Sequence, residues 1–312
     1  MGKASRAKVE PSRREKIAAQ QAAARRAEQR RRLLIASGSV LVVLVVVIVF
    51  VVVKLNSKPG TDTSSNGPTG SALAAVVKTV TSVPASTLNA VGSGSKQVTA
   101  GPQSIKGTAL TENGKPEVLY IGAEYCPYCG AERWAIIVAL SRFGTFTGLA
   151  TIHSAAADGA GNAEPYPDTP TWTFLHATYS SPYLTFTPVE TYTNIPDKSN
   201  GFYTTLETPT TAEEALLTKY DVPPLVPSGD NGAIPFLDFG NKYASAGVSY
   251  SNNVLAGLKW AQIAADLSNS KSKTAQAIDG VANYITAAIC GITNNVPASA
   301  CTSGVQSLES QI

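Results

Sequence analysis

Histidine and methionine are scarce in this chain of 312 residues, and no cysteine precedes position 126. The two histidines, His153 and His176, are too few and too far apart in the sequence to build a metal site. Met1 is the only methionine, which gives little support to a copper-delivery or cytochrome-maturation role. A glycine-rich phosphate loop, a Ser-His-Asp set and a paired acidic motif are also missing. We therefore expect no cofactor and no metal.

Basic charge is concentrated at the N-terminus. Residues 1–32 hold 11 Lys and Arg against three Glu, a net charge of +8, so the rest of the chain carries −5 within a total of +3. The basic sequence pI of about 8.6 is therefore an average of two unlike parts and does not indicate nucleic-acid binding. We interpret residues 1–32 as a basic cytoplasmic tail, with binding to anionic lipid headgroups as a further option.

An apolar run follows the tail. Residues 33–53 are apolar apart from Ser37, Gly38 and Ser39, and 21 helical residues at ~1.5 Å each span about 31 Å, enough for a bilayer core. We predict one transmembrane helix over residues 33–55. Clustered Arg before it places the N-terminus in the cytoplasm and the rest of the chain outside the cell membrane. A cleaved signal peptide is the alternative, but the run is too long and no small-residue cleavage site follows it.

Residues 56–71 contain no large apolar side chain and are predicted to be a flexible linker. The remaining residues, 72–312, are enough for one domain with its own core. Within it we expect strands over 117–123, 149–156, 234–239 and 242–249, a β-hairpin over 171–193 with its turn at 180–182, and helices over 72–83, 127–143, 211–220, 251–268 and 274–289.

Two cysteines lie at the first strand–helix junction, in the sequence Cys126-Pro127-Tyr128-Cys129. A helix N-terminus presents unpaired N–H groups and the positive end of the helix dipole, and both stabilise a thiolate. Cys126 is the expected nucleophile and the more exposed thiol. Cys129 is the expected resolving thiol. The alternative is a permanent structural disulfide between them, for which such a short loop is poorly suited.

This order of elements, with the cysteine pair at the first junction and Ile234-Pro235 at the start of a later strand, resembles the thioredoxin superfamily. The resemblance implies a thioredoxin-like α/β fold, here with an inserted β-hairpin region and an extra C-terminal helix. It also implies that the bond before Pro235 is cis and that its loop lies beside the cysteine sulfurs. Ile234, Pro235 and Tyr128 are then the expected substrate-contacting residues.

A closer resemblance is to a prokaryotic family of membrane-anchored, thioredoxin-like proteins defined as a domain of unknown function (number 929). It covers about residues 85–310 and rests on the stretch from Ile121 to Cys129, Arg133-Trp134, the segments at 141–144 and 179–183, and Pro188-Val189-Glu190.

The sequence departs from thioredoxins in two places. Tyr120 stands six residues before Cys126, where thioredoxins keep a buried Asp as proton acceptor, and this weakens the case for a reductase. An insert at about residues 158–197 could shape a substrate groove or pack on the sheet.

Two charged residues lie close to the cysteines in the sequence. Arg133 could stabilise a thiolate or form a surface ion pair, and Glu124 could act on Cys126 or be a solvated charge.

Cys290 and Cys301 form the second cysteine pair. We predict a structural disulfide that holds the C-terminal segment, since the pair lacks a helix start that would activate a thiol. The alternatives are a redox pair that relays electrons to Cys126 and Cys129, and a zinc site built from all four thiolates, which an oxidising compartment disfavours.

Together these features predict an extracytoplasmic thiol–disulfide oxidoreductase that acts as an oxidase or isomerase. Its partners would be protein thiols and disulfides, together with a membrane redox partner that recycles the cysteine pair. The alternative is a non-catalytic binding or scaffold domain in which both cysteine pairs serve stability.

Overall fold

The structure, a computed structural model, describes residues 67–312. The predictions for residues 1–32, 33–55 and most of 56–71 therefore lie outside the described residues. Within 67–312 no single helix is long and apolar enough to cross a membrane. Helices α2 (Gly70–Val80) and α3 (Ala85–Val91), bent by 58°, pass that test only as a pair and by length and composition. Val76, Val80 and Leu88 of this pair belong to the main hydrophobic core.

A six-stranded mixed sheet forms the centre of the domain, around β3 (Lys115–Gly122). β11 (Phe236–Phe239) pairs with β3 antiparallel, and β8 (Thr185–Glu190) pairs with it in parallel on the other side. The remaining strands are β12 (Tyr243–Ala246) beyond β11, β1 (Gln103–Ser104) at the edge, and β2 (Thr111–Glu112), which pairs with the start of β3.

Both faces of β3 are buried, which explains its continuous apolar sequence. Val118 and Tyr120 belong to the large core on one face of the sheet. Leu119 and Ile121, which alternate with them, belong to a second core on the other face. The strand therefore carries the chain through the middle of the domain and delivers Cys126 just beyond its carboxyl end.

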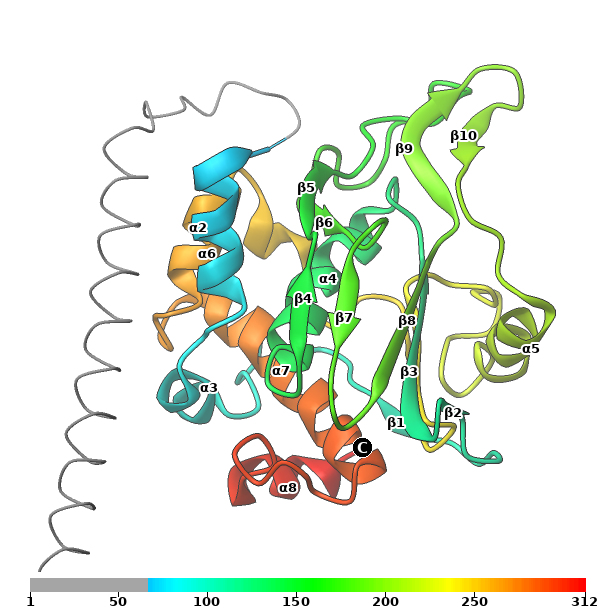
Figure 1. Cartoon of the computed structure of the whole chain (residues 1–312). Helices are drawn as coiled ribbons and strands as arrows, with labels where there is room; N and C mark the ends of the chain where they lie inside the picture. The colour runs from blue at the N-terminus through cyan, green and yellow to red at the C-terminus, as the bar shows by residue number, and fades with distance from the viewer. Residues whose placement is uncertain (1–66) are drawn as a thin grey trace, which may run out of the picture. The chain divides into compact units, whose positions relative to one another are not determined.

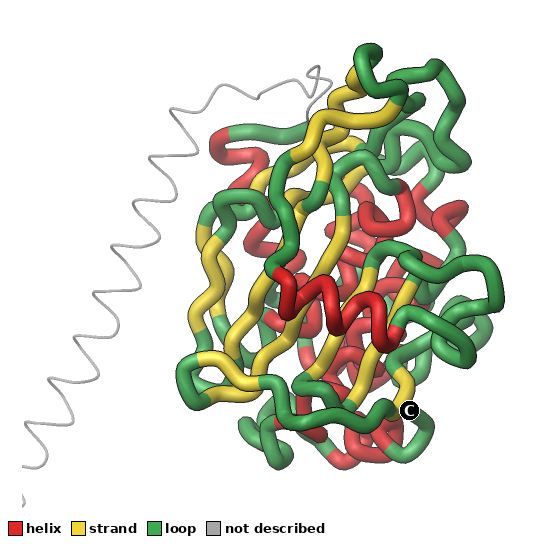
Figure 2. Tube along the Cα trace, turned by 90° about the vertical axis from the view of Figure 1, so that its right-hand side faces the viewer, coloured by secondary structure: helices red, strands yellow, loops and turns green. Residues whose placement is uncertain are grey.

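Helices cover the two faces unequally (Figure 1). α4 (Pro127–Leu140) and α7 (Lys273–Ile292) pack against each other on the larger core, next to α6 (Trp260–Asp266). On the opposite face lies α5 (Thr211–Tyr220), which crosses the strands in Figure 2. The last helix, α8 (Ser303–Glu309), packs on α7. The domain is thus an α/β sandwich of helices, sheet and helix, as the sequence predicts.

Helix starts follow the expected local chemistry. The helix predicted over 211–220 is confirmed as α5. It begins with a capping box, in which the Thr210 hydroxyl accepts the Glu213 N–H and the Glu213 carboxylate accepts the Thr210 N–H. The helix predicted over 251–268 is interrupted. A 3-10 turn, η1 (Asn252–Leu255), is separated from α6 by Gly257, whose φ of +71° lies in the left-handed region that ends a helix.

The hairpin predicted over 171–193 is wrong. Its two halves pair with other strands: β6 (Pro170–Thr173) joins β5 (Ala150–His153), while β8 joins the central sheet. Between them, β7 (Thr178–Ser180) pairs with β4 (Thr145–Thr147). Alternation of side chains predicts strands but does not choose their partners, because partner choice depends on contacts distant in sequence.

A true hairpin follows directly. It consists of β9 (Tyr192–Asp197) and β10 (Phe202–Thr205), and it extends past the end of β8 (Figure 1). Because β8 ends beside the carboxyl end of β3, this hairpin begins next to the cysteine pair: the Tyr192 carbonyl accepts the Glu124 N–H at 2.9 Å.

Several carboxyl groups lie inside the helical core. Glu132 on α4 is 1% exposed and accepts hydrogen bonds from the Ser249 N–H and hydroxyl at 3.0 and 2.9 Å. Asp279 on α7 is fully buried, and neither of its oxygens has a hydrogen-bond partner among residues 67–312. Burial raises the pKa of Glu132 to about 7 and that of Asp279 to about 8.

We expect the protein to be more stable at about pH 5 than at about pH 8. Both carboxyls have a pKa raised by folding, so between about pH 4 and 8 the folded state retains protons that the unfolded state has released, and the unfolding free energy falls as pH rises. Asp279→Asn should flatten this dependence and raise the unfolding free energy at pH 8 by on the order of 2 kcal/mol. Thermal unfolding of the wild type and of Asp279→Asn at both pH values measures this difference. The same change of unfolding free energy with pH in the two proteins would contradict the prediction.

Candidate thiol site

The first cysteine of the pair caps a helix. Cys126 is the N-cap residue of α4, Pro127 occupies the first helical position, and the Cys126 sulfur accepts the Cys129 N–H at 3.3 Å. Cys126 and Cys129 are both free thiols. The strand–turn–helix context predicted from the sequence is therefore confirmed, and the Cys126 sulfur lies at the positive end of the α4 dipole.

Both thiols are covered. Cys126 is 4% exposed and Cys129 is 0% exposed, so Cys126 is the more accessible of the two, as predicted, but it is not an exposed nucleophile. The cover comes from half-buried side chains that pack around Ala123 and the two cysteines: Tyr125, Tyr128, Tyr192 and Ile234. Cys126 is covered in part because the β9–β10 hairpin contributes Tyr192, an aromatic side chain that local sequence could not locate.

The Ile234-Pro235 segment lies beside the first sulfur. Its peptide bond is cis, as the resemblance implied, and the Cys126 thiol lies 3.8 Å from the Ile234 carbonyl oxygen, to which it donates. Pro235 is buried and leads directly into β11. The structure thus brings together four of the predicted site residues, Cys126, Cys129, Ile234 and Pro235, with Tyr128 at their edge.

The two thiols differ in acidity. Burial opposes ionisation of Cys126, but hydrogen bonds from the Cys129 thiol and N–H, together with the charge of Arg133, hold its pKa below the ordinary value. Burial raises the pKa of Cys129 well above its ordinary value, and the hydrogen bond to Cys126 adds to the effect. Cys126 is therefore the thiol that ionises first, which agrees with the order of roles predicted from the sequence.

Arg133 forms a buried ion pair rather than the surface pair considered above. Arg133 and Glu190 are both 0% exposed. Arg133 Nε donates to Glu190 Oε1 at 3.0 Å and Nη2 donates to Oε2 at 2.6 Å, in a bidentate arrangement. Glu190 ends β8, so the pair joins α4 to the central sheet beneath the cysteines.

Tyr120 and Glu124 complete the surroundings of the pair. Tyr120 is fully buried, and burial raises its pKa well above the ordinary value, so it carries no charge at neutral pH. A Cβ on Gly122 would overlap the Tyr120 hydroxyl, so glycine is required there. Glu124 is 7% exposed rather than solvated, and burial raises its pKa.

An aromatic cluster borders the site. Tyr125 stacks on Tyr203 with ring centroids 4.1 Å apart and contacts Phe202 edge-to-face at 5.2 Å. The residues before Thr169 also reach the site: the Ala155 N–H donates to the Tyr125 carbonyl at 2.9 Å, and Tyr166 meets Tyr128 at 5.9 Å. The insert therefore lies along the rim of the cysteine pair as well as packing on the domain.

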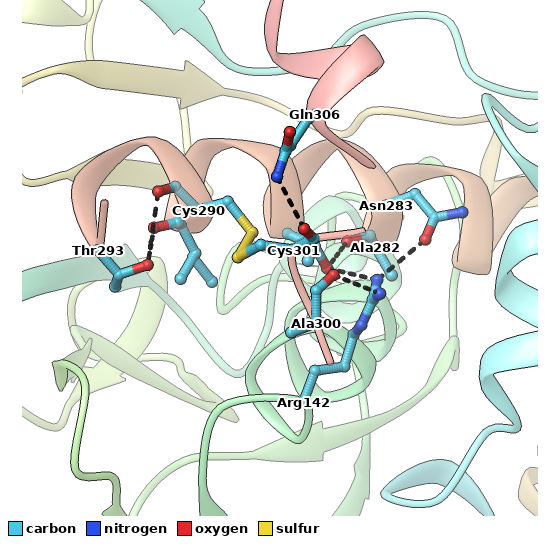
Figure 3. Close-up of a disulfide and its surroundings, with 10 residues drawn as sticks. Arg142, Ala282, Asn283, Cys290, Thr293, Ala300, Cys301 and Gln306 are labelled. Carbon is cyan, nitrogen blue, oxygen red and sulfur yellow. Dashed lines mark hydrogen bonds between the residues drawn. A yellow bond between two sulfur atoms is a disulfide. The ribbon is translucent and has the colours of Figure 1, made fainter. Parts of the chain in front are cut away.

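The second cysteine pair is a disulfide between Cys290 and Cys301 (Figure 3). Arg142, just past the end of α4, holds the same region: its Nη1 donates to Asn283 and Thr286 at 3.1 Å and its Nη2 to the Ala300 carbonyl at 2.8 Å. Since the two sulfurs are bonded to each other, they are not free ligands for the four-thiolate zinc site.

The disulfide lies at the opposite end of α4 from Cys126. Fourteen helical residues at ~1.5 Å each separate the two ends by about 21 Å. Thiol–disulfide exchange requires one sulfur to attack another directly, so this separation favours the structural role over the relay.

Replacing both Cys290 and Cys301 by Ser should lower the unfolding free energy by about 2–3 kcal/mol, because the cross-link reduces the conformational entropy of the unfolded chain. Denaturant unfolding measures the loss. The alkylation rate of Cys126 in the folded variant should stay as in the wild type; a changed rate would favour the relay.

Three features of the site escaped the sequence analysis: the burial of Arg133, its pairing with Glu190 and the stacked ring of Tyr203. The burial of Arg133 was indicated by its spacing, because it follows Cys129 by four residues and so lies on the same helix face. Glu190 belongs to a stretch that carries the family resemblance, but no local signal pairs it with Arg133, and none places the ring of Tyr203, since both come from strands whose partners are set only in the folded domain.

The fold and this site define a mixed α/β domain with a free thiol pair at a helix N-terminus and a separate disulfide. The model of the family described as "Domain of unknown function (DUF929)" matches residues 102–291, and the chain belongs to that family. This confirms the closer of the two resemblances. No curated protein and no solved structure matches the chain.

Proposed function

We propose that the domain is a thioredoxin-like thiol–disulfide oxidoreductase. The observation that carries the proposal is the Cys126 sulfur, which caps α4, lies against the Ile234 carbonyl and has Cys129 one helical turn away. The strand order β12-β11-β3-β8, with the cysteines between β3 and α4 and a cis Ile234-Pro235 bond before β11, supports the thioredoxin-like assignment.

The chemistry follows from the two acidities. The Cys126 thiolate attacks one sulfur of a substrate disulfide, forming a mixed disulfide and releasing the other substrate sulfur as a thiolate. Cys129 then loses its proton and attacks the Cys126 sulfur, which releases the second substrate thiol and leaves a Cys126–Cys129 disulfide. In the opposite direction, a substrate thiolate attacks the Cys126 sulfur of the oxidised pair and releases Cys129. A second substrate thiolate then attacks the substrate sulfur of this mixed disulfide, which releases Cys126 and leaves the disulfide in the substrate.

The direction we propose is oxidation or isomerisation of protein thiols. The low pKa of Cys126 stabilises the reduced pair and so makes its disulfide a better oxidant. The uncharged Tyr120 supplies no carboxylate near the sulfurs, which agrees with this direction. With the expected membrane anchor at residues 33–55, the domain would act outside the cell membrane, and a membrane redox partner would reoxidise the pair.

Substitution of each cysteine separates the two roles. Cys126→Ser should abolish exchange with protein disulfides, whereas Cys129→Ser should accumulate a mixed disulfide on Cys126 because the resolving thiol is lost. Non-reducing mass spectrometry of each variant with a disulfide substrate measures both outcomes. Iodoacetamide should modify Cys126 before Cys129 in the reduced protein.

The main alternative is a non-catalytic scaffold, which the burial of Cys126 favours. A Cys126 that resists alkylation in the folded protein, together with a Cys129→Ser variant that traps no substrate, would establish the scaffold and exclude the oxidoreductase. The Cys290→Ser, Cys301→Ser double variant is the control for a general loss of stability.

We further propose that protein substrates bind along the aromatic surface that leads from the site onto the β9–β10 hairpin. Tyr125 directly precedes Cys126, and Phe202 contacts both Tyr125 and Tyr192 at 5.2 and 5.1 Å. Phe202 is 38% exposed and Ile195 on the same hairpin is 61% exposed. An extended polypeptide with an apolar residue near its cysteine could cover these side chains while its sulfur reaches Cys126.

Phe202→Ser should therefore raise the KM for a protein disulfide by about tenfold, which corresponds to the loss of about 1.4 kcal/mol of binding energy. A small aromatic disulfide that does not reach the hairpin should react at an unchanged rate. Val296→Ser is the matched control, because Val296 is another exposed apolar residue, 48% exposed and close to Cys301 in sequence. Equal losses with both substrates would contradict a binding role for the hairpin.

A further inference from the structure

Arg133 is a buried cation on the helix that begins at the thiol pair. It follows Cys129 by four residues, and side chains at this spacing lie one above the other on a helix face. Its Nη2 donates to the Ala123 carbonyl oxygen at 2.7 Å, and the same oxygen accepts the Cys126 N–H at 3.3 Å. A single carbonyl therefore connects the guanidinium to the loop that carries the reactive sulfur.

The carboxylate that balances this charge is itself held in place. Glu190 takes both hydrogen bonds described above, and its Oε1 also accepts the Phe174 N–H at 3.2 Å. The guanidinium thus contacts both a fixed anion at the end of β8 and the loop that carries Cys126. In this low-dielectric interior, charges act on one another over longer distances than they do in water.

The ion pair leaves part of the guanidinium unused. Arg133 Nη1 is buried and has no hydrogen-bond partner among residues 67–312. A buried donor without a partner is costly, and an ion pair serving stability alone would gain from satisfying it. The centre of the Tyr120 ring lies 5.8 Å from the guanidinium carbon and brings no counter-charge.

We propose that Arg133 is a positioning residue that stabilises the thiolate of the Cys126–Cys129 pair, and that Glu190 limits the strength of this effect. The inference rests on the proposed function and adds the group that sets its redox direction. Reduction of the Cys126–Cys129 disulfide takes two electrons and one proton when one sulfur remains a thiolate. A nearby cation favours that product, so the disulfide becomes a stronger oxidant.

The effect of the Arg133 charge on the two sulfurs agrees with this proposal. The positive charge of Arg133 lowers the pKa of Cys126, after the larger opposing effect of burial and the hydrogen bonds from Cys129, and it acts in the same direction on Cys129. Removing Arg133 and removing Glu190 should therefore have opposite effects. A merely structural pair predicts the same effect for both, because either change leaves one buried charge without its partner.

The test uses the full-length protein with Cys129→Ser and three further variants, each in turn: Arg133→Met, Glu190→Gln and Arg142→Met. The readout is the pH dependence of iodoacetamide alkylation of Cys126. Arg133→Met should slow alkylation at neutral pH by about tenfold, because the thiolate loses its cation. Glu190→Gln should speed it several-fold, because the cation loses its counter-charge.

Arg142→Met is the matched control. Arg142 is a half-buried arginine just beyond the other end of α4, bonded to Asn283, Thr286 and Ala300. It should destabilise the protein while leaving the alkylation of Cys126 unchanged. With Cys129 restored, equilibration of each variant with glutathione should give a less oxidising pair for Arg133→Met and a more oxidising pair for Glu190→Gln.

Changes of the same sign in the two variants, or no change in either, would overturn the inference. If Arg133→Met does not fold, as thermal unfolding would reveal, Arg133→Lys replaces it: the charge is kept, so alkylation should stay near the wild-type rate while Glu190→Gln still speeds it. The alkylation profile needs no turnover. If the two variants change the alkylation rate in opposite directions but the protein exchanges no disulfides, only the proposed function is wrong. If the protein exchanges disulfides but neither variant changes the alkylation rate, only the role of Arg133 is wrong.

Discussion

The buried ion pair between Arg133 and Glu190 is the interaction on which the arrangement around the cysteines depends. It joins the first turns of α4 to the last residue of β8, and through the Ala123 carbonyl it reaches the end of β3. Separating two such charges inside a protein leaves each uncompensated, at a cost of about 3–5 kcal/mol. The relative positions of these three elements are therefore tightly constrained.

This constraint has a chemical consequence as well as a structural one. The N-terminus of α4 and the guanidinium both favour an anionic sulfur at Cys126, while burial among the surrounding aromatic side chains opposes its ionisation. The same cover restricts access to the sulfur. The acidity of Cys126 thus depends on α4 and on the burial that opposes ionisation, whereas its accessibility depends on the β9–β10 hairpin and the Ile234-Pro235 loop.

Much of the fold could be predicted because its signals are local. The apolar run of β3, the capping box of α5 and the cysteine N-cap of α4 each depend on residues within a few positions of one another. The partner of β8 could not be predicted this way. Residues 171–187 alternate like a hairpin, but β8 gains more by burying its side chains beside β3, some 70 residues earlier in the chain.

The amino-acid sequence by itself determined the elements and the chemistry available to them: a thiol at a helix start, a central strand buried on both faces, and a proline at the start of β11. Only the tertiary structure decided how reactive and how accessible that thiol is. The physical reason is that burial, counter-charge and aromatic cover come from residues distant in sequence. Tyr192 packs on the cysteines, Glu190 binds Arg133 and Tyr203 stacks on Tyr125 only when β8 pairs with β3 and the following hairpin forms.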